Sequence, residues 1–310
     1  MLHHLVRGIL KNNHGSISKA ITLIENSQSP PEPFFSDIHK NAFNSVRIGI
    51  TGPPGAGKST LTSSLIEFCL ADGKEVGVIA VDPTSPFTGG ALLGDRVRMN
   101  KYVGDNRVFL RSMGNHCDLG GLSSKVQEIG DVLAASGKDY IFFETVGVGQ
   151  GEHDIINVAD ISIVVLVPES GDEIQLMKAG LIEIADIFVI NKSDREGSNR
   201  IASTLKNILH IFKKQDRREP SVFNTIANKQ EGVLELFNGI ELYLRMIDKE
   251  GLLESRKLER YRKRVFDIIQ NSLETSFWSS GKQKQLIDLT KNIDGTSIDP
   301  HTVAKQLLQG

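Results

Sequence analysis

The feature that most constrains the fold is a glycine-rich loop between a strand-like run and a helix-like run. Residues 52–60 match the pattern G-x-x-x-x-G-K-[ST], with VRIGIT (46–51) before them and LTSSLIEFCL after them. Glycines let the backbone fold closely around phosphates, with amide N–H groups pointing inward at a helix N-terminus. This context favours a nucleoside triphosphate site over a chance glycine-rich turn. The predicted phosphate-binding residues are Gly52, Pro53, Pro54, Gly55, Ala56, Gly57, Lys58, Ser59 and Thr60.

Two side chains of this loop carry charge and metal chemistry. Lys58 is expected to neutralise the β- and γ-phosphates, and the Ser59 hydroxyl is placed to bind Mg²⁺. With the guanine specificity indicated by a second motif at residues 191–194, the predicted ligands are GTP or GDP together with Mg²⁺.

Apolar, β-branched runs alternate with helix-length spacers through most of the chain. Their near-continuous apolarity suits strands that are buried on both faces, and the spacers suit right-handed crossovers. The pattern predicts an α/β fold with a doubly wound, mostly parallel sheet. The predicted strands are 46–51, 75–82, 107–112, 139–145, 161–168, 186–191 and 221–226.

Three regions are expected. Residues 1–44 form an N-terminal helical extension that ends in a proline-rich linker, SQSPPEPFF (27–35), in which the prolines predict no continuing helix. Residues 45–242 form the P-loop domain. Residues 243–310 are helical and strongly charged.

A second motif, Asn191-Lys192-Ser193-Asp194, follows the strand at 186–191, where an open α/β sheet binds its ligand. The Asp194 carboxylate can accept hydrogen bonds from guanine N1–H and from its exocyclic amine. Adenine offers no such pair, so the motif predicts guanine selection by Asn191, Lys192 and Asp194 rather than a plain polar turn. Backbone contacts to the other side of the base are expected from Thr225, Ile226 and Ala227.

Acidic residues at strand ends are candidates for the Mg²⁺ site. Asp82 and Asp95 flank a segment rich in proline and glycine, and each could otherwise be a turn former or a helix cap. Glu144 begins E-T-V-G at the D-x-x-G position of GTPases, where the Gly147 amide could contact the γ-phosphate. Many GTPases place a water-orienting glutamine after that glycine. Val148 stands there instead, so slow intrinsic hydrolysis and stimulation by a partner are expected.

The motif set resembles the MeaB/ArgK group of P-loop GTPases. The resemblance rests on GITGPPGAGKST, VDPTSPFTGGALLGDR, ETVGVGQ, LMKAGLIEIADI and NKSD in this order, with SKAITLIE and IDPHTVAKQLL nearer the ends. It implies a homodimeric G-protein chaperone of an adenosylcobalamin-dependent acyl-CoA mutase, most often methylmalonyl-CoA mutase. Such a protein uses GTP to gate cofactor loading and to protect or reactivate the mutase.

The resemblance also implies three switch segments at residues 83–98, 145–151 and 169–178. By the same resemblance, Lys178 in the third segment is expected to act in catalysis or to help relay the nucleotide state to the mutase. Two features depart from the family pattern: His153 is peculiar to this chain, and residues 251–270 match the family's dimer arm only loosely.

Composition excludes other classes. The formal net charge is −2, which argues against a nucleic-acid binder, and two cysteines favour a reducing compartment. The apolar run 161–167 is far shorter than the ~18–20 residues that cross a bilayer. Without the apolar core of a secretory signal near its start, the chain is expected to be cytoplasmic, with no membrane and no nucleic-acid partner.

Two alternatives remain open. A metallochaperone GTPase would fit the His116-Cys117-Asp118 run, although one Cys–His pair is a weak metal signal, and Cys69 has the helical spacing of a core residue. A P-loop kinase acting on a small molecule would predict a preference for ATP, against which the N-K-x-D motif argues.

Overall fold

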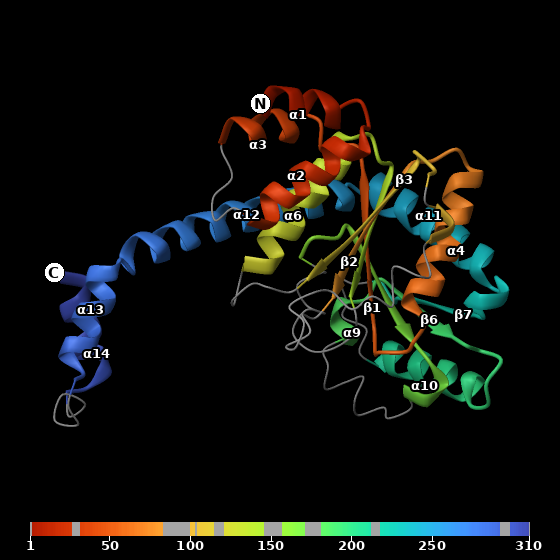
Figure 1. Ribbon diagram of the computed structural model, residues 1–310. Coiled ribbons are helices and arrows are strands. Elements are labelled where there is room, and N and C mark those ends of the chain that lie inside the picture. Colours follow the sequence, from red (N-terminus) through yellow and green to blue (C-terminus); the bar gives the residue numbers. More distant parts are fainter. Residues whose placement is uncertain are drawn as a thin grey trace. The chain divides into compact units, whose positions relative to one another are not determined.

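A computed structural model of the chain describes residues 2–26, 32–82, 100–102, 104–114, 121–145, 157–170, 181–211, 218–291 and 298–309 (Figure 1). The chain divides into two compact units, Met1–Lys257 and Leu258–Gly310. The predicted boundary after residue 242 falls within helix α11 (Val233–Lys249), whereas the division between the compact units falls after Lys257.

The first unit contains a seven-stranded sheet in the order β3-β2-β4-β1-β5-β6-β7. Every pairing between these described strands is parallel, so the predicted doubly wound α/β fold is confirmed. Strand β1 lies at the centre, where Ile48 is paired with Phe142 on one side and Ile161 on the other. The strands are β1 (Val46–Thr51), β2 (Val76–Asp82), β3 (Val108–Gly114), β4 (Tyr140–Thr145), β5 (Ile161–Leu166), β6 (Ile187–Asn191) and β7 (Ser221–Thr225).

Helices cover both faces of this sheet (Figure 1). Because successive strand residues point to opposite faces, Phe142 packs in one apolar cluster and its neighbour Phe143 in the other. The helical segments of this unit are α1 (Leu2–Ile9), α2 (His14–Asn26), α3 (Glu32–His39), η1 (Asn100–Tyr102), α4 (Lys58–Ala71), α6 (Gly121–Ala135), η2 (Pro168–Ser170), α9 (Leu181–Ile184), α10 (Ser198–Ile211), η3 (Ala227–Lys229) and α11.

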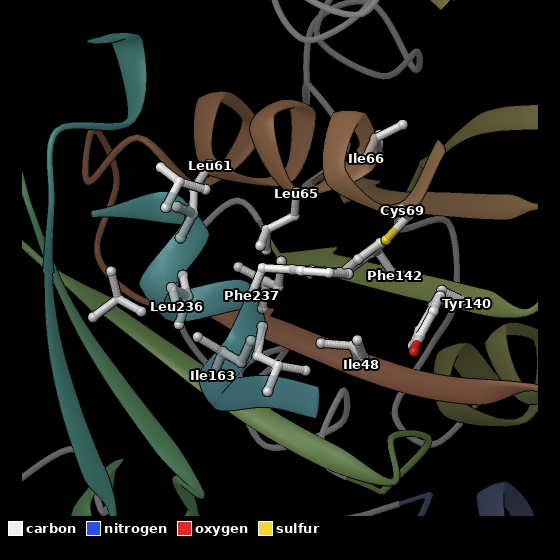
Figure 2. Close-up of a cluster of buried hydrophobic side chains, with 14 of the residues drawn as sticks. Ile48, Leu61, Leu65, Ile66, Cys69, Tyr140, Phe142, Ile163, Leu236 and Phe237 are labelled. Atoms are coloured by element: carbon white, nitrogen blue, oxygen red, sulfur yellow. The ribbon is translucent and has the colours of Figure 1, made fainter. Parts of the chain in front are cut away.

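The cluster around Phe142 joins α4 and α11 to the sheet, and Figure 2 shows its side chains converging from these elements. Leu65 and Cys69 of α4 meet Phe237 of α11 in this layer. Cys69 is buried, and burial raises the pKa of its thiol to about 12. The core role predicted for Cys69 is therefore confirmed.

The opposite cluster joins the N-terminal helices and α6 to the sheet. Helix α2 ends at Asn26, before the proline-rich segment, and a new helix begins within that segment. Helix α3 begins at Glu32, inside the segment 27–35 that was expected to be a linker. Pro33 is compatible with this start because a first-turn residue needs no backbone N–H for the helix. Phe34 and Ile38 of α3 are buried in the cluster, which gives this short helix its tertiary support.

The second unit consists of helical segments. Helix α12 (Leu252–Phe277) begins in the first unit and continues into the second, which also holds α13 (Ser280–Leu289) and α14 (Pro300–Gln309). Lys282 of α13 donates a hydrogen bond to the Leu307 carbonyl of α14. In the part of the chain that the structure describes, no helix combines the length and apolarity needed to cross a membrane.

Candidate nucleotide site

The loop between β1 and α4 has the backbone conformation that its glycines allow. Gly52, Gly55 and Gly57 have φ values of 138°, 74° and 87°. Gly57 is the left-handed N-cap residue directly before α4, and a Cβ there would lie 2.4 Å from the Asn191 Nδ2 atom. Both the backbone and the available space therefore require glycine at position 57.

Lys58 is the first residue of α4 and is almost completely buried. Its Nζ atom donates hydrogen bonds to the carbonyl oxygens of Gly52 (2.8 Å) and Pro53 (3.0 Å). These contacts hold a cation against the loop itself. An ammonium group in this place can neutralise the charge of phosphates that the loop encloses.

Ser59 and Glu144 lie side by side, although 85 residues separate them in the sequence. The Ser59 hydroxyl donates to Glu144 Oε1 at 2.5 Å, and Glu144 is only 4% exposed. The Thr62 hydroxyl donates to the other carboxylate oxygen at 3.2 Å. Hydroxyl and carboxylate oxygens are donors that suit Mg²⁺, so the described part of the predicted ligand set fits that ion.

Asn191 joins the predicted base loop to the phosphate loop. Its Nδ2 atom donates to the Ala56 carbonyl at 2.8 Å. Its Oδ1 atom accepts from the Thr225 hydroxyl (3.2 Å) and from the Ala227 backbone N–H (3.1 Å). Lys192, with a φ of 56°, donates from Nζ to the Gly55 carbonyl at 2.7 Å. The buried side-chain amide of Asn191 thus joins three predicted segments: the phosphate loop, the loop 191–194 and residues 225–227.

The remaining base-loop residues lie at the carboxyl ends of β6 and β7. The Ser193 N–H donates to the Thr225 carbonyl at 3.0 Å, which sets this loop beside β7. Asp194 has an exposed carboxylate, 3.7 Å from the Lys229 Nζ atom. The Ile226 N–H donates to the Glu231 carbonyl at 2.9 Å.

Several predicted site residues cannot be placed in this geometry. Asp95, Gly147 and Lys178 lie outside the described residues, as do His153 and the run 116–118. Asp82 ends β2, at the same edge of the sheet as Glu144, but its side chain is not among those described.

Two residues that the sequence analysis did not single out contact the predicted site. One is Thr62, and the other is Ser64, whose hydroxyl donates to the Ala227 carbonyl at 3.0 Å. Both are buried on α4, where hydroxyl groups interrupt an otherwise apolar run. Buried hydroxyls need partners, so this interruption was the available signal.

A parallel sheet with a G-x-x-x-x-G-K-[ST] loop between its central strand and the next helix defines the P-loop nucleotide-binding class. Residues 17–282 match the family described as methylmalonyl Co-A mutase-associated GTPase MeaB, and the chain belongs to this family. The resemblance expected from the motifs is confirmed. Membership in a GTPase family implies guanine-nucleotide binding.

Named relatives align along nearly the whole chain. A Pyrococcus abyssi protein, described only as a candidate GTPase, is 39% identical, with 100% of this chain and 96% of that protein aligned. The GTPase ArgK of Escherichia coli is 32% identical (97% and 94% aligned), and the mouse mitochondrial methylmalonic aciduria type A homolog is 28% identical (98% and 78%). The crystal structure of an LAO/AO transport system kinase has a TM-score of 0.71 at 26% identity, covering 99% of this chain and 96% of its own.

Two of the three loop glycines, Gly55 and Gly57, provide a matched test of the site. Gly55→Ala adds a methyl group that meets nothing within 4 Å, whereas Gly57→Ala also pushes against Asn191. Both variants carry left-handed backbone strain of about 1–2 kcal/mol. We expect the dissociation constant for GDP, measured by titration with a fluorescent GDP analogue, to rise at least about tenfold more in Gly57→Ala. Equal losses in the two variants would show that the contact with Asn191 does not matter.

Proposed function

We propose that the chain binds and hydrolyses GTP with Mg²⁺ and acts as a G-protein chaperone of an adenosylcobalamin-dependent acyl-CoA mutase of the methylmalonyl-CoA mutase type. In this role it gates cofactor loading and protects or reactivates the mutase. The observation that carries the proposal is the family match over residues 17–282, whose description pairs a GTPase with that mutase. The name of the mouse relative, which refers to methylmalonic aciduria, supports the same link.

The nucleotide chemistry follows from the contacts around the loop. The phosphates would lie along residues 52–60, with Lys58 neutralising their charge, and Asp194 would read guanine while Asn191 holds the two loops together. Mg²⁺, when bound, supplies charge stabilisation at the β- and γ-phosphate oxygens. The residues that would hold it are Ser59, Asp82, Asp95 and Glu144.

The reaction is attack of water on the γ-phosphorus. The bond from that phosphorus to the β,γ-bridging oxygen breaks, which gives GDP and inorganic phosphate. The Gly147 amide would contact the γ-phosphate, and Val148 leaves the usual glutamine position without a water-orienting side chain. We therefore expect slow intrinsic turnover, with Lys178 acting when a partner stimulates the reaction.

The function is tested by GTP turnover with and without a purified adenosylcobalamin-dependent acyl-CoA mutase from the same source. A many-fold rise that is specific to GTP would support the chaperone role. No change with the mutase present would contradict it. Phosphate transfer to a small-molecule acceptor, with a preference for ATP, would instead favour a kinase, the activity named for the structural relative.

Guanine selection has a separate test at Asp194. In Asp194→Asn the side chain keeps an acceptor for guanine N1–H but faces the exocyclic amine with an amide donor. We expect the preference for GDP over ADP to fall by about two orders of magnitude. Xanthosine diphosphate, with a carbonyl in place of that amine, should bind the variant better than GDP does. Asp248→Asn, on the exposed side of α11, is the matched control.

The homodimer is also part of the proposal, and helix α12 supports it. All of α12 is described, and none of its residues is buried. Leu258, Tyr261, Val265 and Ile268 are exposed and follow the 3-4 spacing of a coiled-coil seam, which a second copy could cover. Val265→Glu is expected to shift the protein from dimer to monomer in sedimentation, whereas Gln270→Glu is not. A dimer that survives Val265→Glu would place the interface elsewhere.

A further inference from the structure

The buried hydroxyl of Thr62 is not assigned by the nucleotide chemistry described above. Thr62 lies one helical turn after Lys58 on α4, and its side chain is fully buried. Its Oγ1 atom lies 3.2 Å from Glu144 Oε2 and 3.0 Å from the Lys58 carbonyl oxygen. It therefore contacts one carboxylate oxygen, while Ser59 contacts the other, Oε1.

We infer that Thr62 is a positioning residue for magnesium-dependent nucleotide binding, because it fixes Glu144 in the orientation that accepts the Ser59 hydroxyl hydrogen. With that hydrogen directed to Glu144, the lone pairs of Ser59 Oγ are left for the ion. The inference rests on the proposed function, since the role of Ser59 as a magnesium ligand is part of it.

The length of the glutamate side chain makes this arrangement possible. Glu144 stands where GTPases of the D-x-x-G pattern have aspartate, and its additional methylene carries the carboxylate from β4 to α4. A longer side chain has one more rotatable bond, so it needs a second contact to fix its carboxylate. Thr62 supplies such a contact at Oε2, and the distance of 2.5 Å at Oε1 is typical of a hydroxyl bound to a carboxylate.

The contact of Thr62 with the Lys58 carbonyl oxygen does not explain why a threonine is present at this position. The single hydroxyl hydrogen of Thr62 is shared between Glu144 Oε2 and the Lys58 carbonyl, and the latter contact is open to a threonine in any helix. That carbonyl also receives the regular helical N–H bond, so it stays satisfied without the hydroxyl. A valine at position 62 would lose both contacts, but only the one with Glu144 is not covered by a regular helical hydrogen bond.

The test compares GDP affinity in EDTA with GDP affinity in saturating Mg²⁺, using a fluorescent GDP analogue and the full chain. In Thr62→Val, which keeps the side-chain volume, we expect the gain in affinity from Mg²⁺ to fall about fivefold or more. Affinity in EDTA should stay within about twofold, because the loop itself is unchanged. Thr62→Ser keeps the hydroxyl and should keep the gain. Ser63→Ala, which removes the neighbouring buried hydroxyl of α4, is the matched control.

A double-mutant cycle separates positioning from a structural effect. If Thr62 acts through Glu144, adding Thr62→Val to Glu144→Ala changes the Mg²⁺ gain no further, and thermal melting shows whether each variant is folded. A full gain in Thr62→Val, an equal loss in EDTA, or additive losses in the cycle would each overturn the inference alone. A wild-type protein that binds GDP equally in EDTA and Mg²⁺ would overturn the magnesium role in the proposed function, and the inference with it.

Discussion

The nucleotide site depends on one buried amide, that of Asn191. Its donor holds the Ala56 carbonyl of the phosphate loop, and its acceptor holds Thr225 and Ala227 at the end of β7. Hydrogen bonds in a buried network are strong, and leaving one unmade is costly. The absence of a side chain at Gly57 is what lets the amide approach the loop so closely. The predicted phosphate loop and the predicted base loop are thus fixed to each other.

The order of the strands explains why these distant segments meet. Strand β1 lies between β4 and β5, and all three run parallel to β6 and β7. Their carboxyl ends therefore share one edge, which is where open α/β sheets bind ligands. Helix α4 starts at the same edge and lies beside β4, so hydroxyl groups on its first turns reach Glu144.

The sequence supported the sheet and the phosphate loop far better than the contacts around them. Buried parallel strands are continuous β-branched runs, so all seven were located to within about two residues of their observed ends. The start of α3 was missed because its helix is supported by burial of Phe34 and Ile38, which local proline patterns do not report. Thr62 and Ser64 were missed because the role of a hydroxyl in a helix depends on the strand or loop packed against it, and the sequence does not show which one that is.

The other end of β6 is joined to helix α12. Asp186 directly precedes β6, and its carboxylate accepts hydrogen bonds from Arg256 at 2.8 and 3.1 Å and from the Tyr243 hydroxyl at 2.7 Å. Arg256 lies in the first two turns of α12 and also donates to the Asp160 carbonyl at 2.7 Å. Asp186 is buried whereas Arg256 is partly exposed, so removing the guanidinium would leave a buried carboxylate without this charge partner. The five-residue strand β6 is therefore joined to the predicted base loop at one end and to the first turns of α12 at the other. Any displacement of β6 would have to move both the loop and these turns.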